Sequence, residues 1–319
     1  MSRIDNKAWR EILKNYAQSK ALERRALHHL HDRQTLNELT LHLADYLSSE
    51  NQHAVVRTES VWIDGTPQAK ATTRTASVQC ELADLLILMT VTKNSRVTKR
   101  SAVLIQAKVG TAVDIIPGGD STKKERSLLE EMDHSKKLSL YRDTQAKSLI
   151  GEYQLRSSGF GLRDYARYMV MPVSLGPVVF ERFAPFVTGW PSSTKSSRLK
   201  NLELFKSLPV DLWLGSVGHP MNSASPDEWT DMIEDLLGYY AKKRMKRFNG
   251  FDRHLQSSEI ASFMIDTRKM PGQARWARRI EASGDPPDHF DFEGRSPDGD
   301  QPPALPVISF VIELLEGRD

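Results

Sequence analysis

Two short apolar runs constrain the fold of this chain more than any other feature. Residues 85–89 read Leu-Leu-Ile-Leu-Met, and residues 102–105 read Ala-Val-Leu-Ile. Continuous runs of this length, rich in branched side chains, are typical of strands that are buried in a sheet. The basic, polar segment between them, residues 93–100, predicts the turn that joins the two strands. The chain is therefore expected to build its core on a sheet.

The other elements follow from the spacing of apolar residues. A period of 3.6 residues predicts helices, and runs of β-branched and aromatic residues bounded by turn signals predict strands. The predicted helices are 5–31, 35–49, 124–149 and 227–247, and the predicted strands are 54–63, 75–92, 101–109, 165–173 and 307–312. Helices and strands alternate along the chain, which indicates an α/β protein.

Length and composition allow one large domain or two smaller ones. The chain has 319 residues, of which 39% are hydrophobic and 27% charged, so it can bury a core. The sequence divides into an N-terminal helix over 1–34, a core over 35–175 and a C-terminal extension over 176–319. That extension is predicted to hold a basic helix, an acidic Pro/Asp/Gly-rich linker over 281–304 and a final strand.

The charge is distributed unevenly, although the whole chain carries a formal charge of only +3. Residues 281–319 hold ten acidic and two basic side chains, which leaves 42 basic and 31 acidic side chains for residues 1–280. A basic body can attract a polyanion, and an acidic tail can compete for the same surface. The acidic segment is thus either a mimic of nucleic acid or a solvated linker that leads to the last strand.

Several classes of protein are not expected. Cys80 is the single cysteine, which excludes a disulfide framework and disfavours a cysteine zinc site. No apolar stretch is long enough to span a bilayer, and the first residues lack the apolar region of a secretory signal. We therefore expect a cytoplasmic protein without a membrane partner.

Polar residues interrupt the two apolar strands at positions where more Val or Ile would be expected. Asp84 directly precedes the first run, and Gln106-Ala107-Lys108 ends the second. Because strand side chains alternate between faces, Gln106 and Lys108 point the same way. If the two strands pair as a hairpin, the polar residues converge at one end of the sheet. A buried lysine there requires a partner or a role.

Asp84 and Gln106-Ala107-Lys108 resemble the motif of the PD-(D/E)xK nuclease superfamily, in its Gln-x-Lys variant. The predicted order α-β-β-β-α-β over 35–175 is similar to the common core of that superfamily. The resemblance implies a restriction-endonuclease-like core, a mixed sheet flanked by helices, with a C-terminal α/β extension. It also implies a divalent-metal-dependent endonuclease that hydrolyses DNA phosphodiester bonds, in restriction or anti-phage defence.

The resemblance also implies roles for individual residues. Asp84 would be the main ligand of Mg²⁺ or Mn²⁺, Gln106 would add its carbonyl oxygen, and Lys108 would orient or polarise the attacking water. Hard oxygen ligands suit both ions. Because Gln106 is neutral, the site needs a further acid: Glu38, from the helix over 35–49, or Glu81, if a bulge turns it inward. Glu38 is equally explained as the third residue of a capping box that begins at Thr35.

Two basic segments are candidates for contact with nucleic acid. The side chains that would contact the phosphate groups are those of Lys242, Lys243, Arg244, Lys246, Arg247, Arg275, Arg278 and Arg279. The alternative for each segment is a solvated helix end that carries favourable cations. The expected partner is DNA, with RNA left open, and a homodimer would suit double-strand cutting. The implied defence role adds partner proteins of a defence system as further candidates. The alternative function is a catalytically inactive nuclease-fold module that binds DNA or a partner protein.

Overall fold

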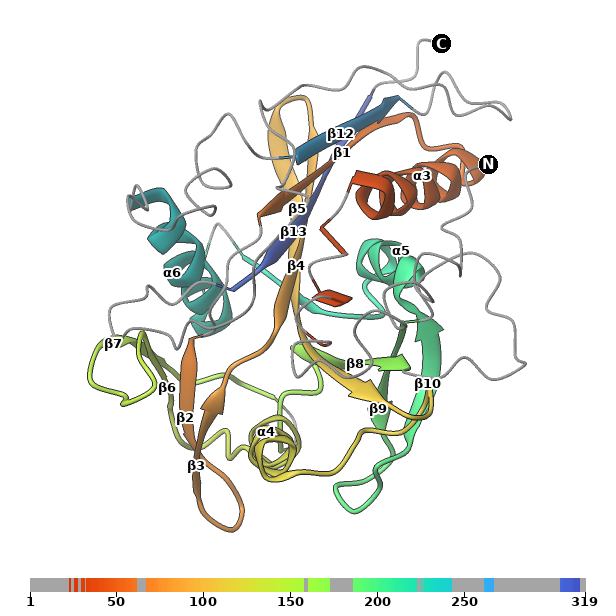
Figure 1. Cartoon of the computed structure of the whole chain (residues 1–319). Helices are drawn as coiled ribbons and strands as arrows, with labels where there is room; N and C mark the ends of the chain where they lie inside the picture. The colour runs from red at the N-terminus through yellow and green to blue at the C-terminus, as the bar shows by residue number, and fades with distance from the viewer. Residues whose placement is uncertain are drawn as a thin grey trace, which may run out of the picture.

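The computed structural model describes seven continuous segments of the chain and six further residues. The segments are 33–61, 67–157, 160–172, 186–222, 227–242, 261–266 and 305–315, and the further residues are 23, 26, 27, 30, 31 and 225. Within this part the protein is an α/β structure with two sheets and flanking helices (Figure 1). In the same part, no helix is long and apolar enough to cross a membrane.

Nine strands of the described chain form one mixed sheet. In spatial order they are β10 (Leu199–Leu204), β9 (Val187–Pro191), β8 (Ala166–Pro172), β5 (Arg96–Gly110), β4 (Leu85–Lys93), β13 (Val307–Leu314), β1 (Ala54–Val61) and β12 (Ala261–Asp266), and the short β11 (His219–Pro220) pairs with β5. Strands β4 and β5 are antiparallel, whereas β8 runs parallel to β5 and β13 runs parallel to β4.

Smaller elements complete the fold. The second sheet has the order β3 (Ser77–Glu81), β2 (Gln68–Thr72), β6 (Leu138–Tyr141) and β7 (Leu149–Tyr153). The helices are α3 (Arg33–Ser49), α4 (Asp120–Glu131), α5 (Leu208–Leu214) and α6 (Glu228–Lys242), and a short 3₁₀ helix, η1, covers Phe205–Ser207.

The predicted hairpin between the two apolar strands is confirmed. Lys93 pairs with Arg96, so Asn94 and Ser95 alone form the turn. Both turn residues have positive φ, 51° and 59°, as a type I′ turn requires. The turn places Thr92 opposite Val97, and an irregularity between Val91 and Thr92 then shifts the pairing by one residue, so that Leu85 pairs with Ile105.

The large sheet is covered on both faces, and each face has its own hydrophobic core. On one face, which we call the α3 face, α3 and α5 pack against residues such as Ile87 and Ile105. On the other, the α4 face, α4, α6 and the second sheet pack against residues such as Leu86 and Leu104. Figure 1 shows α3 and α5 to one side of the long central strands and α6 to the other. Burial on both faces explains why these strands read as continuous apolar runs.

Two predicted elements are wrong in extent. The helix predicted over 124–149 ends at Glu131, and the chain then forms β6 and β7. Side chains in β6 alternate between buried and half-buried, which is the pattern of a strand and not of a helix. The strand region predicted over 75–92 consists of β3 and β4, which belong to different sheets.

The sheet does not divide at the predicted boundary near residue 175. Strand β8 pairs with β9 across that boundary, and β13 lies between β4 and β1 at the centre of the sheet. The C-terminal residues therefore complete the same sheet that the N-terminal half begins. The acidic linker predicted over 281–304 lies outside the described residues.

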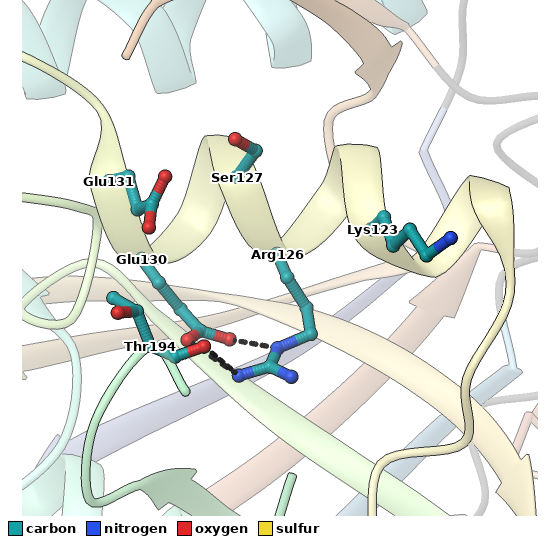
Figure 2. Close-up of a pocket in the computed structure, with 6 residues that line it drawn as sticks. All are labelled: Lys123, Arg126, Ser127, Glu130, Glu131 and Thr194. Atoms are coloured by element: carbon teal, nitrogen blue, oxygen red, sulfur yellow. Dashed lines mark hydrogen bonds and ion pairs between the residues drawn. The ribbon is translucent and has the colours of Figure 1, made fainter. Parts of the chain in front are cut away.

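Helix α4 is attached to the sheet by a buried polar network. Tyr168, on β8, donates its hydroxyl to Glu130 Oε1 at 2.9 Å. Arg126 donates to both oxygens of Glu130, at 2.6 and 2.9 Å, and to the carbonyl oxygen of Thr194 (Figure 2). It also donates to the carbonyl oxygen of Ser196. The network joins α4 to β8 and to the chain between β9 and β10, so it sets where the helix lies.

Substitution of Tyr168 by Phe is expected to destabilise the protein by about 1–3 kcal/mol, because it leaves a buried carboxylate short of a donor. Urea unfolding measures the loss. Tyr153→Phe is the matched control: its hydroxyl donates to Asp235, which is exposed and can bind water instead, so the expected loss is about 0.5–1 kcal/mol. Equal losses in the two variants would contradict a role for the buried network.

Candidate active site

Asp84 lies where the chain passes from the second sheet to the large one. Strand β3 ends at Glu81, and β4 begins at Leu85. Leu82 and Ala83 are fully buried in the crossing, and the backbone N–H of Asp84 donates to the carbonyl oxygen of Ile105 at 2.9 Å. This bond ties Asp84 to β5 at Ile105, the residue next to Gln106.

Gln106 and Lys108 lie on the same face of the sheet as Asp84. Ile105 and Ala107 belong to the core of the α3 face, and Leu104 belongs to the core of the α4 face. Alternation along β5 therefore places Gln106 and Lys108 on the α4 face. Both are buried, with exposed fractions of 1% and 8%. The predicted convergence of the polar strand ends is thus observed.

Asp84 and Gln106 are joined by direct hydrogen bonds. Asp84 Oδ2 accepts from Gln106 Nε2 at 2.5 Å and from the backbone N–H of Ala107 at 2.8 Å. The other amide atom, Gln106 Oε1, is buried and has no hydrogen-bond partner among the described residues. A buried carbonyl oxygen without a donor is costly.

Lys108 is surrounded by carboxylates that the sequence analysis did not identify. Its Nζ lies 2.9 Å from Oε2 of Glu125, on α4, and 3.6 Å from Oε1 of Glu23. Glu125 precedes the buried Leu128 and Leu129 by three and four positions. That spacing puts the acid on the buried face of a helix. An acidic residue at this spacing from buried leucines was the signal that could have revealed Glu125.

The charges of this group affect one another strongly. Burial acts to lower the pKa of the Lys108 ammonium, but the carboxylates of Asp84, Glu23 and Glu125 outweigh it and hold that pKa above its ordinary value. Burial raises the pKa of Asp84 well above its usual range, and Lys108 offsets this only in part. Burial likewise raises the pKa of Glu23. Three carboxylates share one ammonium, and the group carries an excess of negative charge when all are ionised.

The two additional acids predicted for the site do not join this group. Glu38 belongs to α3, whose leucines pack on the α3 face, opposite to Gln106 and Lys108. Helix α3 begins at Arg33, so Thr35 lies inside the helix and the predicted capping box does not start it. Glu81 ends β3 with an exposed side chain, although its charge contributes to the raised pKa of Asp84.

The residues present fit a divalent cation. Asp84 offers a carboxylate, and the buried Oε1 of Gln106 is an oxygen of the kind that Mg²⁺ and Mn²⁺ prefer. Mg²⁺ is commonly held by one or two carboxylates together with waters and substrate phosphate, and Asp84 supplies one such carboxylate. In the described part of the chain, no three His, Cys, Asp or Glu side chains are grouped as a metal site, so the fit depends on Gln106.

A pocket of about 160 Å³ on the outer side of α4 is separate from this group (Figure 2). The residues that line it are Lys123, Arg126, Ser127, Glu130, Glu131 and Thr194. Two basic and two acidic side chains cancel in charge, and the Arg126 guanidinium is already bound to Glu130. The pocket therefore offers no excess charge for a phosphate.

The residues predicted to contact nucleic acid lie almost entirely outside the described part of the chain. Lys243, Arg244, Lys246 and Arg247 are among these, as are Arg275, Arg278 and Arg279. Lys242 is described only as the last residue of α6, without its side chain. Their contact with nucleic acid stays a prediction from the sequence.

Comparison with known proteins gave no further guidance. Neither a scan of family models nor searches of curated proteins and of solved structures found a significant match to this chain.

Proposed function

We propose that this protein is a divalent-metal-dependent nuclease with a restriction-endonuclease-like core, which hydrolyses DNA phosphodiester bonds. The observation that carries the proposal is the buried group on the α4 face. There Asp84 and Gln106 lie in direct contact, and Lys108 is held nearby by Glu125. Lysine and acidic side chains are almost never fully buried unless they are paired, and a carboxylate that can hold a metal ion beside an ammonium that can stabilise developing charge suits hydrolysis of a phosphodiester.

The ligands and their chemistry follow from this arrangement. Asp84 and Gln106 would hold Mg²⁺ or Mn²⁺, which would lower the pKa of a water and offset charge on the phosphate. Gln106 would serve best with its amide reversed, because the oxygen would then lie beside the carboxylate and share the cation with it. The excess negative charge of the group favours a divalent cation over a monovalent one.

Lys108 supplies the positive charge of the reaction. Because the neighbouring carboxylates hold its pKa above the ordinary value, the ammonium stays protonated near neutral pH. It can therefore donate hydrogen bonds to the attacking water or to a phosphate oxygen as negative charge develops there. It cannot act as the general base.

The second candidate is an inactive nuclease-fold module that binds DNA or a partner protein. One observation favours it: the amide nitrogen of Gln106 donates a hydrogen bond to Asp84 Oδ2. In the form of the motif that has Asp or Glu at this position, a second carboxylate would lie there instead. A neutral residue at this position weakens metal binding. Activity decides between the two candidates.

Lys108→Ala is expected to lower metal-dependent cleavage by a factor of about 10² to 10³, the loss typical of removing one charge-stabilising donor. Wild-type protein and variant would be incubated with plasmid, linear duplex, single-stranded DNA and RNA in Mg²⁺ or Mn²⁺. Ca²⁺ and a chelator serve as negative controls. The RNA arm tests the choice of DNA as substrate.

Lys99→Ala is the control, because Lys99 also lies on β5 but binds the carbonyl oxygen of Trp213, away from Asp84. It should cleave like the wild type. Equal cleavage by wild type and Lys108→Ala, or no cleavage by the wild type on any substrate, would reject the proposed nuclease.

A further inference from the structure

Glu125 is an acidic residue on the buried face of α4, where Thr122, Leu128 and Leu129 are also buried. Its side chain is 3% exposed. Burial of a carboxylate is unfavourable unless its charge is compensated. Here Oε1 accepts a hydrogen bond from the hydroxyl of Ser121 at 2.7 Å, and Oε2 forms an ion pair with Lys108 Nζ at 2.9 Å.

The pairing restricts a side chain that otherwise has much freedom. A lysine side chain carries its charge on a long flexible stem and loses considerable entropy when it is fixed. Lys108 lies near the end of β5, where neighbouring strand residues alone do not determine where the ammonium points. The carboxylate of Glu125 gives the ammonium a fixed acceptor on the same face as Asp84.

Helix α4 is itself held at a defined position. Five residues after Glu125, Glu130 accepts the hydroxyl of Tyr168, and Arg126 ties the helix to the chain between β9 and β10. Tyr168 pairs in register with Gln106 on the neighbouring strand. The contacts that hold α4 in place therefore include a residue of β8, the strand that pairs with β5, which carries Gln106 and Lys108.

We propose that Glu125 is the positioning residue of this site, and that it supplies from α4 the negative charge that the neutral Gln106 lacks. It orients the Lys108 ammonium and balances its charge without touching the substrate. This inference rests on the proposed nuclease function for its effect on rate. The ion pair itself can be tested without that function.

Glu125→Gln is the central variant, since it keeps the shape and removes the charge. We expect kcat to fall by about 10- to 100-fold, as for other residues that orient a catalytic group, while KM changes by no more than about twofold. Glu125→Asp should recover part of the rate. Acylation of amines by an acetylating reagent, followed by peptide mass spectrometry, should show that Lys108 reacts several times faster in Glu125→Gln than in the wild type.

Glu131→Gln is the matched control. Glu131 lies on the same helix, apart from the Arg126–Glu130 pair (Figure 2). The substitution is identical, so any general effect of lost charge on α4 would appear in both variants. Ser121→Ala provides a second test, because Ser121 is exposed and its loss should not unfold the protein. It should shift kcat and Lys108 acylation in the same direction as Glu125→Gln, by a smaller factor.

The outcomes separate the two proposals. If the wild type cleaves nothing, the nuclease proposal fails, and unchanged acylation of Lys108 in Glu125→Gln would then overturn this inference as well. If the wild type cleaves, the inference is overturned when Glu125→Gln keeps the wild-type kcat or when Glu131→Gln loses as much. If Glu125→Gln does not fold, an unchanged kcat and acylation pattern in Ser121→Ala overturns it.

Discussion

Removal of residues 281–319 is expected to unfold the protein, because it deletes β13 from the centre of the large sheet. Strand β13 pairs with β1 on one side and with β4 on the other, and Ile308, Phe310 and Ile312 are almost fully buried. Truncation of a buried Phe alone costs about 3–5 kcal/mol. The total stability of a domain is about 5–15 kcal/mol, so the loss of the whole strand exceeds what the fold can tolerate. Circular dichroism and urea unfolding measure the result.

A separate variant isolates the acidic segment from the strand. Replacing the acidic residues between 281 and 300 by Asn or Gln leaves β13 intact and should leave the protein folded. If the acidic segment covers a DNA-binding surface, this variant binds DNA more tightly than the wild type in low salt. If the truncated protein unfolded as cooperatively as the wild type and at the same urea concentration, β13 would be dispensable and this prediction would be wrong.

Asp84→Asn is expected to lower the rate of cleavage by a factor of about 10² to 10³ or more, while making the metal-free protein more stable near neutral pH. The rate falls because the variant loses the main anionic ligand. Stability rises because burial makes the charge of Asp84 unfavourable even with Lys108 beside it. Lys108 keeps Glu125 and Glu23 as partners in the variant.

The direction of the pKa shift of Asp84 determines how the free energy of unfolding changes with pH. The pKa of Asp84 is raised in the folded state, so between the ordinary carboxyl pKa, about 4, and the folded value the folded state binds more protons than the unfolded state. The stability that Asp84 contributes is therefore present at low pH and is lost as pH rises through that window. Asp84→Asn removes this loss, so its free energy of unfolding should fall less steeply with pH than that of the wild type.

Urea unfolding from about pH 4 to pH 8 in a chelating buffer tests the prediction. Asp114→Asn is a suitable control, since Asp114 pairs with the exposed Arg198 at the surface and should follow the wild-type curve. A variant of Asp84 less stable than the wild type at every pH would mean that the carboxylate stabilises the fold, against the direction of its raised pKa.

Much of the fold could be predicted from local sequence patterns. The two apolar runs became β4 and β5, the Lys93–Arg96 turn closed their hairpin, and the last apolar run became β13. These elements are set by side-chain alternation and turn chemistry, which act over a few residues. The helix predicted over 124–149 failed because β6 gains its stability by pairing with β2, a contact between residues about 70 apart.

The site, like the fold, has some residues that local sequence patterns predict and others that depend on tertiary contacts. Asp84, Gln106 and Lys108 could be chosen from the sequence, because polar residues on buried strands stand out and the hairpin register brings them together. Glu38 was selected for its helix, but that helix packs on the other face of the sheet. Which face a helix covers depends on chain connections and cannot be read from the period of the helix itself.

The sequence by itself determined that the polar ends of two buried strands meet, because a hairpin brings the start of its first strand beside the end of its second, and burial of the apolar side chains selects one register. Only the tertiary structure decided which acids complete the group. Glu125 and Glu23 reach Lys108 through the packing of their helices, and β13 enters the centre of the sheet from the far end of the chain. These contacts join segments distant in sequence, and their positions follow from burial of the whole core, which no local pattern encodes.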